Sequence, residues 1–64
     1  MNKEYKRREK ADKTEAKLRG CGRCELIAYL YWYNLIEYEN LSNKEIKDIL
    51  IQYSYDHNKT LYIK

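Results

Sequence analysis

The sequence predicts an all-α protein, a small domain of three helices, and three observations lead to this prediction. Residues 2–19 are mostly charged helix formers with no glycine or proline. Residues 24–40 form a long apolar stretch, also without glycine or proline. Ser42 and Glu45 have the spacing of a helix capping box and precede an amphipathic segment. A chain of 64 residues makes one domain at most and is marginally stable alone, so we expect a homodimer or a complex with another protein.

The first predicted helix is a basic arm, residues 1–19, in front of a helical core at residues 20–64. The arm carries eight Lys/Arg and four Asp/Glu, a local net charge of +4, whereas the remainder carries five and six. We expect its last turn, near Ala16 and Leu18, to dock on the core. A basic arm on a nearly neutral body is typical of proteins that bind nucleic acid. The candidate phosphate-binding residues are Lys3, Lys6, Arg7, Arg8, Lys10, Lys13, Lys17 and Arg19, with Tyr5 as a residue that could stack on a base.

The second predicted helix is the apolar stretch of residues 24–40, which follows the break at Gly20 and Gly22. Its length favours a helix over a buried strand, although Tyr, Trp and Ile are also common in strands. A helical projection gives it two apolar faces. One face, for the third helix, holds Leu26, Tyr29, Leu30, Tyr33 and Ile36. The other is expected to bind a second copy or another protein through Ile27, Tyr31, Leu35 and Tyr38.

The third predicted helix begins after Ser42, runs to about His57 and should pack antiparallel on the second. Its apolar face contains Ile46, Ile49, Leu50, Tyr53 and His57. A histidine on this face is expected to be packed in the core. Residues 58–64 start with turn-forming residues and then become apolar, which fits a short strand, an extended tail on the core or a fourth helix.

Residues 41–50, LSNKEIKDIL, allow a second interpretation, because they resemble the opening helix of a helix-turn-helix in sigma-factor-like and other bacterial regulators. That resemblance implies a turn near Gln52 and Tyr53, then a recognition helix capped by Ser54. The helix would present His57, Asn58, Lys59, Thr60 and Lys64 to the major groove of DNA. The alternative is a single capped amphipathic helix.

Cys21 and Cys24 form a CxxC pair with three interpretations. The pair could supply half of a structural zinc site, which needs four ligands, so that two chains would share a four-thiolate site. Within one chain the set could be completed only by His57 and a carboxylate. Cys-Gly-Arg-Cys also resembles the active-site run of thioredoxin-like proteins, but no βαβ pattern surrounds it. In the third interpretation the cysteines have no chemical role.

No other motif in the sequence favours an enzyme or a small-molecule substrate. The chain has one His, no Gly-rich phosphate loop and no nucleophile with an adjacent base. Its basic start is followed by more charge and not by an apolar run, and no apolar run reaches membrane-spanning length, so we expect no signal peptide and a cytoplasmic protein. The sequence therefore predicts a non-enzymatic regulatory protein that acts on nucleic acid or the transcription machinery. The alternative is a protein-interaction inhibitor or adaptor that modulates a cellular enzyme without touching nucleic acid.

Overall fold

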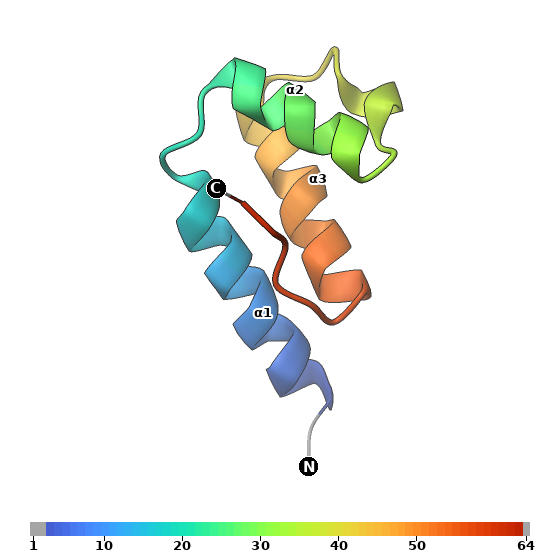
Figure 1. The fold of residues 1–64 in the computed structure, drawn as a ribbon. Helices are drawn as coiled ribbons and strands as arrows, with labels where there is room; N and C mark the ends of the chain where they lie inside the picture. Colours follow the sequence, from blue (N-terminus) through green and yellow to red (C-terminus); the bar gives the residue numbers. More distant parts are fainter. Residues whose placement is uncertain (1–2, 64) are drawn as a thin grey trace.

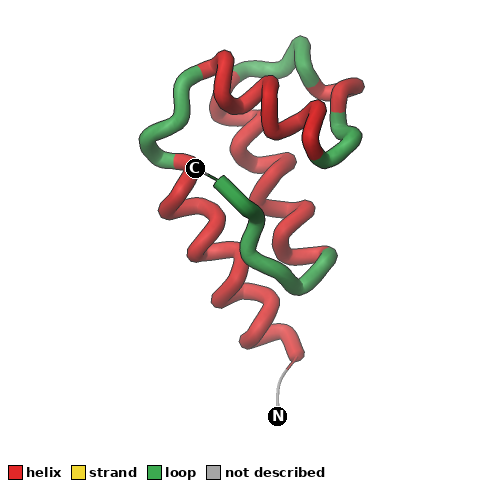
Figure 2. The backbone as a smooth tube through the Cα atoms, viewed as in Figure 1, coloured by secondary structure: helices red, strands yellow, loops and turns green. Residues whose placement is uncertain are grey.

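The computed structural model describes residues 3–63 and confirms the all-α class. Helix α1 spans Lys3–Leu18, α2 spans Arg23–Trp32 and α3 spans Asn43–Asp56, with a short 3-10 helix, η1, at Ile36–Tyr38. No strand occurs within the described residues, and their remaining segments are loops and turns (Figure 2).

The three helices surround the last residues of the chain. Helices α1 and α3 pack side by side and run in opposite directions, while α2 crosses the end of α3 where that helix begins (Figure 1). After α3 the chain turns back and extends between α1 and α3. The main partner of α3 is therefore α1, whereas the sequence predicted α2 in that place.

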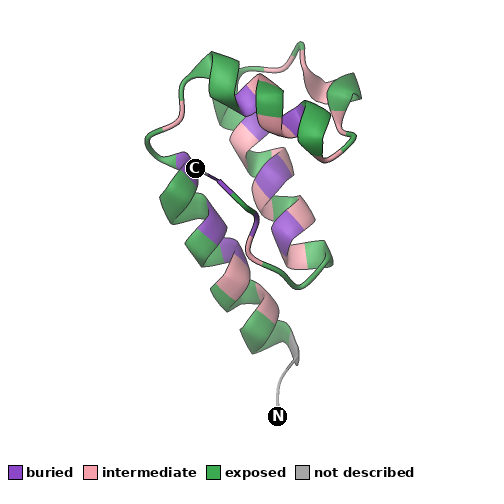
Figure 3. Cartoon of the chain, viewed as in Figure 1, coloured by how far each residue is buried: buried purple, intermediate pink, exposed green. Residues whose placement is uncertain are grey.

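One hydrophobic core joins all of these elements (Figure 3). Its side chains are at most 7% exposed, and each contributes roughly 1.5–3 kcal/mol through burial. They come from α1 (Leu18), α2 (Leu26, Leu30), α3 (Ile46, Leu50) and the tail (Leu61, Ile63).

Helix α1 docks along much of its length, and not only by its last turn as predicted. Ala11, Thr14 and Leu18 are buried, whereas Ala16 is exposed. The buried residues recur at i, i+3 and i+7, the spacing of one helical face. Because two of them are small, α1 can approach α3 and the tail closely without presenting a broad apolar stripe.

The predicted helix over residues 24–40 is wrong in its extent, because α2 ends at Trp32. Asn34 has a φ of 60°, in the left-handed region that asparagine tolerates better than most residues. The backbone N–H of Leu35 then donates to the carbonyl of Leu30 at 2.7 Å and closes the helix end. Residues 36–38 consequently form a separate turn of 3-10 helix.

Helix α3 begins with the predicted capping box. The Ser42 hydroxyl accepts from the Glu45 N–H at 3.2 Å, and the Glu45 carboxylate accepts from the Ser42 N–H at 3.1 Å. The helix continues unbroken to Asp56, so the turn that a helix-turn-helix requires near Gln52 is absent. His57 is exposed at the C-terminal end of α3, not packed in the core, and its ring stacks on Tyr53 with 3.9 Å between centroids.

Replacing Ser42 with alanine should lower the free energy of unfolding by about 1 kcal/mol, because the Glu45 N–H loses its acceptor. Urea unfolding would measure the difference, and Ser42→Thr, which keeps the hydroxyl, is the control. The hydrogen bonds from Ser42 lower the pKa of the Glu45 carboxyl. The contribution of these hydrogen bonds to stability is therefore present at pH values above the pKa of Glu45 in the unfolded chain. It should be lost as the pH falls through the lowered pKa of Glu45 in the folded protein. Equal stability of all three proteins would contradict a role for the cap.

The sequence allowed a short strand, an extended tail or a fourth helix at the end of the chain, and the structure has the extended tail. Leu61 and Ile63 point into the core, while Tyr62 between them is 65% exposed. A chain of buried hydroxyls holds the tail to both long helices. The Leu61 N–H donates to Thr14 Oγ1 at 3.0 Å, and Thr14 Oγ1 lies 2.8 Å from Ser54 Oγ. The Ser54 hydroxyl in turn donates to the Lys59 carbonyl.

Candidate nucleic-acid interface

Four lysines share one side of α1. Lys6, Lys10, Lys13 and Lys17 are separated by steps of four, three and four residues, which places them within a sector of about 60° on the helix. No acidic residue of α1 falls in this sector. We call these four residues the lysine flank; it extends over about 16 Å of the helix axis.

Arg8 and Arg19 lie on a different side of α1, among acids. Arg8, Asp12 and Glu15 line a hollow with the exposed side of α3. Arg19 and Glu15 line a second hollow with residues from the first turns of α3, including Asp48. Acids and arginines therefore gather where α1 meets α3. Two of the four acids of the arm, Asp12 and Glu15, therefore lie toward α3, whereas Glu9 lines a hollow with Lys13 of the lysine flank.

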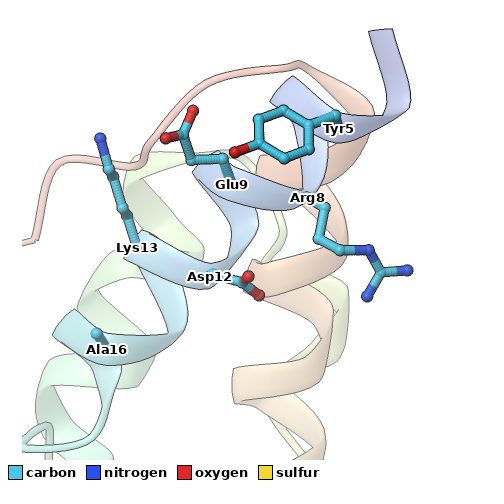
Figure 4. Close-up of a pocket in the computed structure, with 6 residues that line it drawn as sticks. All are labelled: Tyr5, Arg8, Glu9, Asp12, Lys13 and Ala16. Carbon is cyan, nitrogen blue, oxygen red and sulfur yellow. The ribbon is translucent and has the colours of Figure 1, made fainter. Parts of the chain in front are cut away.

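Figure 4 shows the outer surface of α1, where Lys13 of the lysine flank lines a hollow together with Tyr5, Arg8, Glu9, Asp12 and Ala16. Lys13 and Arg8 point to opposite sides of α1, with Asp12 and Glu9 between them. Tyr5 belongs to the same outer surface and is 67% exposed. This tyrosine, which the sequence suggests for base stacking, thus has Glu9 and Asp12 as neighbours.

The tail borders the lysine flank. The Leu61 N–H is bound to Thr14, which lies one helical turn from both Lys10 and Lys17. The next residue, Tyr62, exposes its ring, and its N–H donates to the Tyr33 hydroxyl at 2.9 Å. The backbone of the tail is therefore held between Thr14 of α1 and Tyr33 at the end of α2, and the ring of Tyr62 is exposed on this stretch.

A further cation lies at the start of the tail. The Lys59 ammonium is 5.5 Å from the ring centroid of Tyr33 and 5.7 Å from that of Tyr53, both within cation–π range. The sequence-based site omitted Tyr62 and used Lys59 only in the helix-turn-helix interpretation. Only the folded path of the tail brings them near α1.

The eight predicted arm residues are therefore not equivalent. Arg7 and Lys10 are half-buried, while Lys6, Arg8, Lys13, Lys17 and Arg19 are exposed. The side chain of Lys3 lies outside the part of the chain whose side chains are described. Within this set the structure places Lys6, Lys10, Lys13 and Lys17 in the lysine flank and Arg8 and Arg19 on a mixed-charge side.

The predicted interface does not form one helical face. Ile27, Leu35 and Tyr38 are half-buried and pack on the core of their own chain, and the last two lie beyond the end of α2. Tyr31 alone of the four is exposed, at 53%. The large apolar residues exposed near it are Trp32 at 71% and Ile36 at 39%. Binding of a second copy or another protein stays a prediction.

Both cysteines carry free thiols where α1 leads into α2. Cys24 is exposed, and Cys21 is half-buried with its Sγ 3.8 Å from the Lys17 carbonyl. Burial, with a smaller effect from Glu25, raises the pKa of the Cys21 thiol, although Lys47 opposes the shift. A redox-active thiol needs a lowered pKa, so this environment does not favour the thioredoxin-like interpretation.

The geometry restricts how the cysteine pair could bind zinc. Between residues 3 and 63, no cluster of three or more His, Cys, Asp or Glu side chains is placed to hold a metal. Arg23, inside the CxxC pair, donates to Asn43 at the start of α3, whereas His57 lies about 20 Å away at its other end. The fit of His57 as a third ligand is therefore poor. A four-thiolate zinc site shared by two chains stays a prediction.

Comparisons of the chain with protein-family models, curated proteins and solved structures gave no match. Over the described part of the chain, no helix has both the length and the apolar character needed to cross a membrane.

Proposed function

We propose that this protein is a small non-enzymatic regulatory protein that binds nucleic acid through the lysine flank of α1. The observation that carries the proposal is the grouping of Lys6, Lys10, Lys13 and Lys17 on one side of a docked helix. Lysine ammonium groups neutralise phosphates and release the counterions condensed on them. The docking of α1 along Ala11, Thr14 and Leu18 adds support, because it keeps the four lysines in one orientation.

The proposed binding mode is mainly electrostatic, which sets its expected salt dependence. Four phosphate contacts correspond to a loss in affinity of roughly 50- to 150-fold between 50 and 200 mM salt. Such contacts position a protein on nucleic acid without reading its sequence. In this proposal the protein regulates by occupying the nucleic acid, and the exposed end of α2 provides a surface for the transcription machinery.

Replacing Lys13 and Lys17 together with glutamine should weaken binding and reduce the slope of log affinity against log salt by roughly 1.4 to 1.8. Fluorescence anisotropy with a labelled oligonucleotide at several salt concentrations would measure both changes. The matched control is the double substitution of Arg8 and Arg19 with glutamine, which removes the same charge from the mixed-charge side. The control should change the slope much less.

Two results would contradict the proposal. Equal losses in both double variants would show that net charge, not the lysine flank, determines binding. The absence of binding by the unchanged protein at 50 mM salt would exclude nucleic acid as the ligand.

The second candidate function is that of a protein-interaction inhibitor or adaptor, and the exposed end of α2 favours it. Tyr31, Trp32 and Ile36 present two aromatic rings and an aliphatic side chain to solvent. Trp and Tyr are enriched among the residues that dominate protein interfaces. The discriminating result is a stoichiometric protein complex that forms without nucleic acid and is lost when Trp32 is replaced by alanine.

A further inference from the structure

Tyr62 is an exposed ring on an otherwise immobilised piece of backbone. The side chains of Leu61 and Ile63 are buried on either side of it, at 1% and 7% exposure. The Leu61 N–H is bound to Thr14, and the Tyr62 N–H is bound to the Tyr33 hydroxyl. An extended chain alternates its side chains between two faces, so burying both neighbours directs the Tyr62 ring to solvent.

The backbone on either side of the ring is anchored at residues that lie close to lysines. The anchor of the tail, Thr14, lies one turn from Lys10 and Lys17 on α1. On the other side, Tyr33 binds the Tyr62 backbone and lies beneath the Lys59 ammonium. The backbone that carries the ring is therefore anchored between a residue one turn from two lysines of α1 and a tyrosine that contacts Lys59.

An exposed ring near lysines suits single-stranded nucleic acid better than a duplex. Proteins that bind single strands combine a positive surface for the backbone with aromatic rings on which unpaired bases stack. A duplex keeps the faces of its bases inside the helix, where a surface ring cannot reach them. The ring of Tyr62 gains a contact only if the bases are unpaired.

We infer that the ligand of the lysine flank is single-stranded nucleic acid, and that Tyr62 stacks on one of its bases. The inference rests on the proposed function and names the class of nucleic acid. Tyr5 is as exposed as Tyr62 but is the weaker candidate for stacking. It lines a hollow of mixed charge, in which Glu9 and Asp12 offset Arg8 and Lys13.

The test compares the affinity of the full-length protein for oligo(dT) and for a duplex of equal length. The single strand should bind more tightly. Tyr62→Ala should weaken oligo(dT) binding roughly ten- to a hundredfold, the effect of losing one stacked base, and leave the duplex affinity unchanged. Tyr62→Phe keeps the ring and should retain most of the affinity. Tyr5→Ala is the matched control, with an equally exposed tyrosine, and should have little effect.

These measurements distinguish a failure of the single-strand inference from a failure of the proposed nucleic-acid binding. The inference would be overturned if the protein bound single strand and duplex equally and Tyr62→Ala had no effect on either. The proposed function would still stand in that case if binding weakened in the Lys13/Lys17 double variant. Absence of binding to either probe would overturn both. Circular dichroism melting of Tyr62→Ala must match that of the unchanged protein, since a folding defect would reduce affinity for both probes alike.

Discussion

Replacing Leu61 with alanine should lower the free energy of unfolding by about 2–5 kcal/mol, the range for removing a large aliphatic side chain from a core. Leu61 is 1% exposed and belongs to the same cluster as Leu18, Leu30 and Leu50, which come from the three helices. The cavity would open at the centre of the domain. Small domains have total stabilities near the lower end of 5–15 kcal/mol, so this variant should be partly unfolded at 25 °C. Urea or thermal unfolding followed by circular dichroism would measure the loss.

The neighbouring position supplies the control. Tyr62→Ala removes a larger side chain one residue away, but from the surface, and should change stability by no more than about 0.5 kcal/mol. If Leu61→Ala were as stable as Tyr62→Ala, the tail would not be part of the core.

Replacing Thr14 with valine should cost about 1–3 kcal/mol, even though the two side chains have nearly the same shape. Thr14 is fully buried, and its hydroxyl accepts from the Leu61 N–H while sharing a hydrogen bond with Ser54. Valine would leave the Leu61 N–H buried without an acceptor, and an unpaired buried donor carries its full desolvation cost. The free energy of unfolding in urea measures the effect.

Hydrogen exchange at the Leu61 amide separates this mechanism from a general packing defect. The amide should be protected in the unchanged protein and exchange much faster in Thr14→Val. Thr14→Ser keeps the acceptor and loses only a methyl group, worth about 0.8 kcal/mol, so the amide should stay protected. Rapid exchange in both variants would mean that the hydroxyl is not the anchor.

The sequence predicts those parts of the fold whose signals are local. The capping box of Ser42 and Glu45 and the apolar spacing of Ile46 and Leu50 depend only on neighbouring residues, and both predictions are confirmed. The end of α2 is not predictable in the same way. It depends on Asn34 adopting a left-handed conformation, which asparagine allows but does not require.

The remaining features depend on contacts between distant residues. The docked face of α1 contains Ala11 and Thr14, whose small side chains give almost no hydrophobic signal. The spacing of Lys6, Lys10, Lys13 and Lys17 is visible in the sequence, where it indicates repulsion within an isolated helix. That these lysines form a separate basic side follows only from the packing of α1 on α3. Tyr62 joins that side only because the tail is anchored there.

The anchoring of the tail also has a consequence for how fast the chain folds. Thr14 is hydrogen-bonded to Ser54 and Leu61, which lie 40 and 47 positions further along the chain. The chain must close a loop of that length before Leu61 can pack beside α1. Closing so long a loop costs entropy before any contact forms, and folding rates fall as the mean sequence separation of contacts rises. We therefore expect slower folding than in three-helix proteins whose contacts are mostly local. Destabilising the tail should mainly speed unfolding if it docks after the helices have assembled.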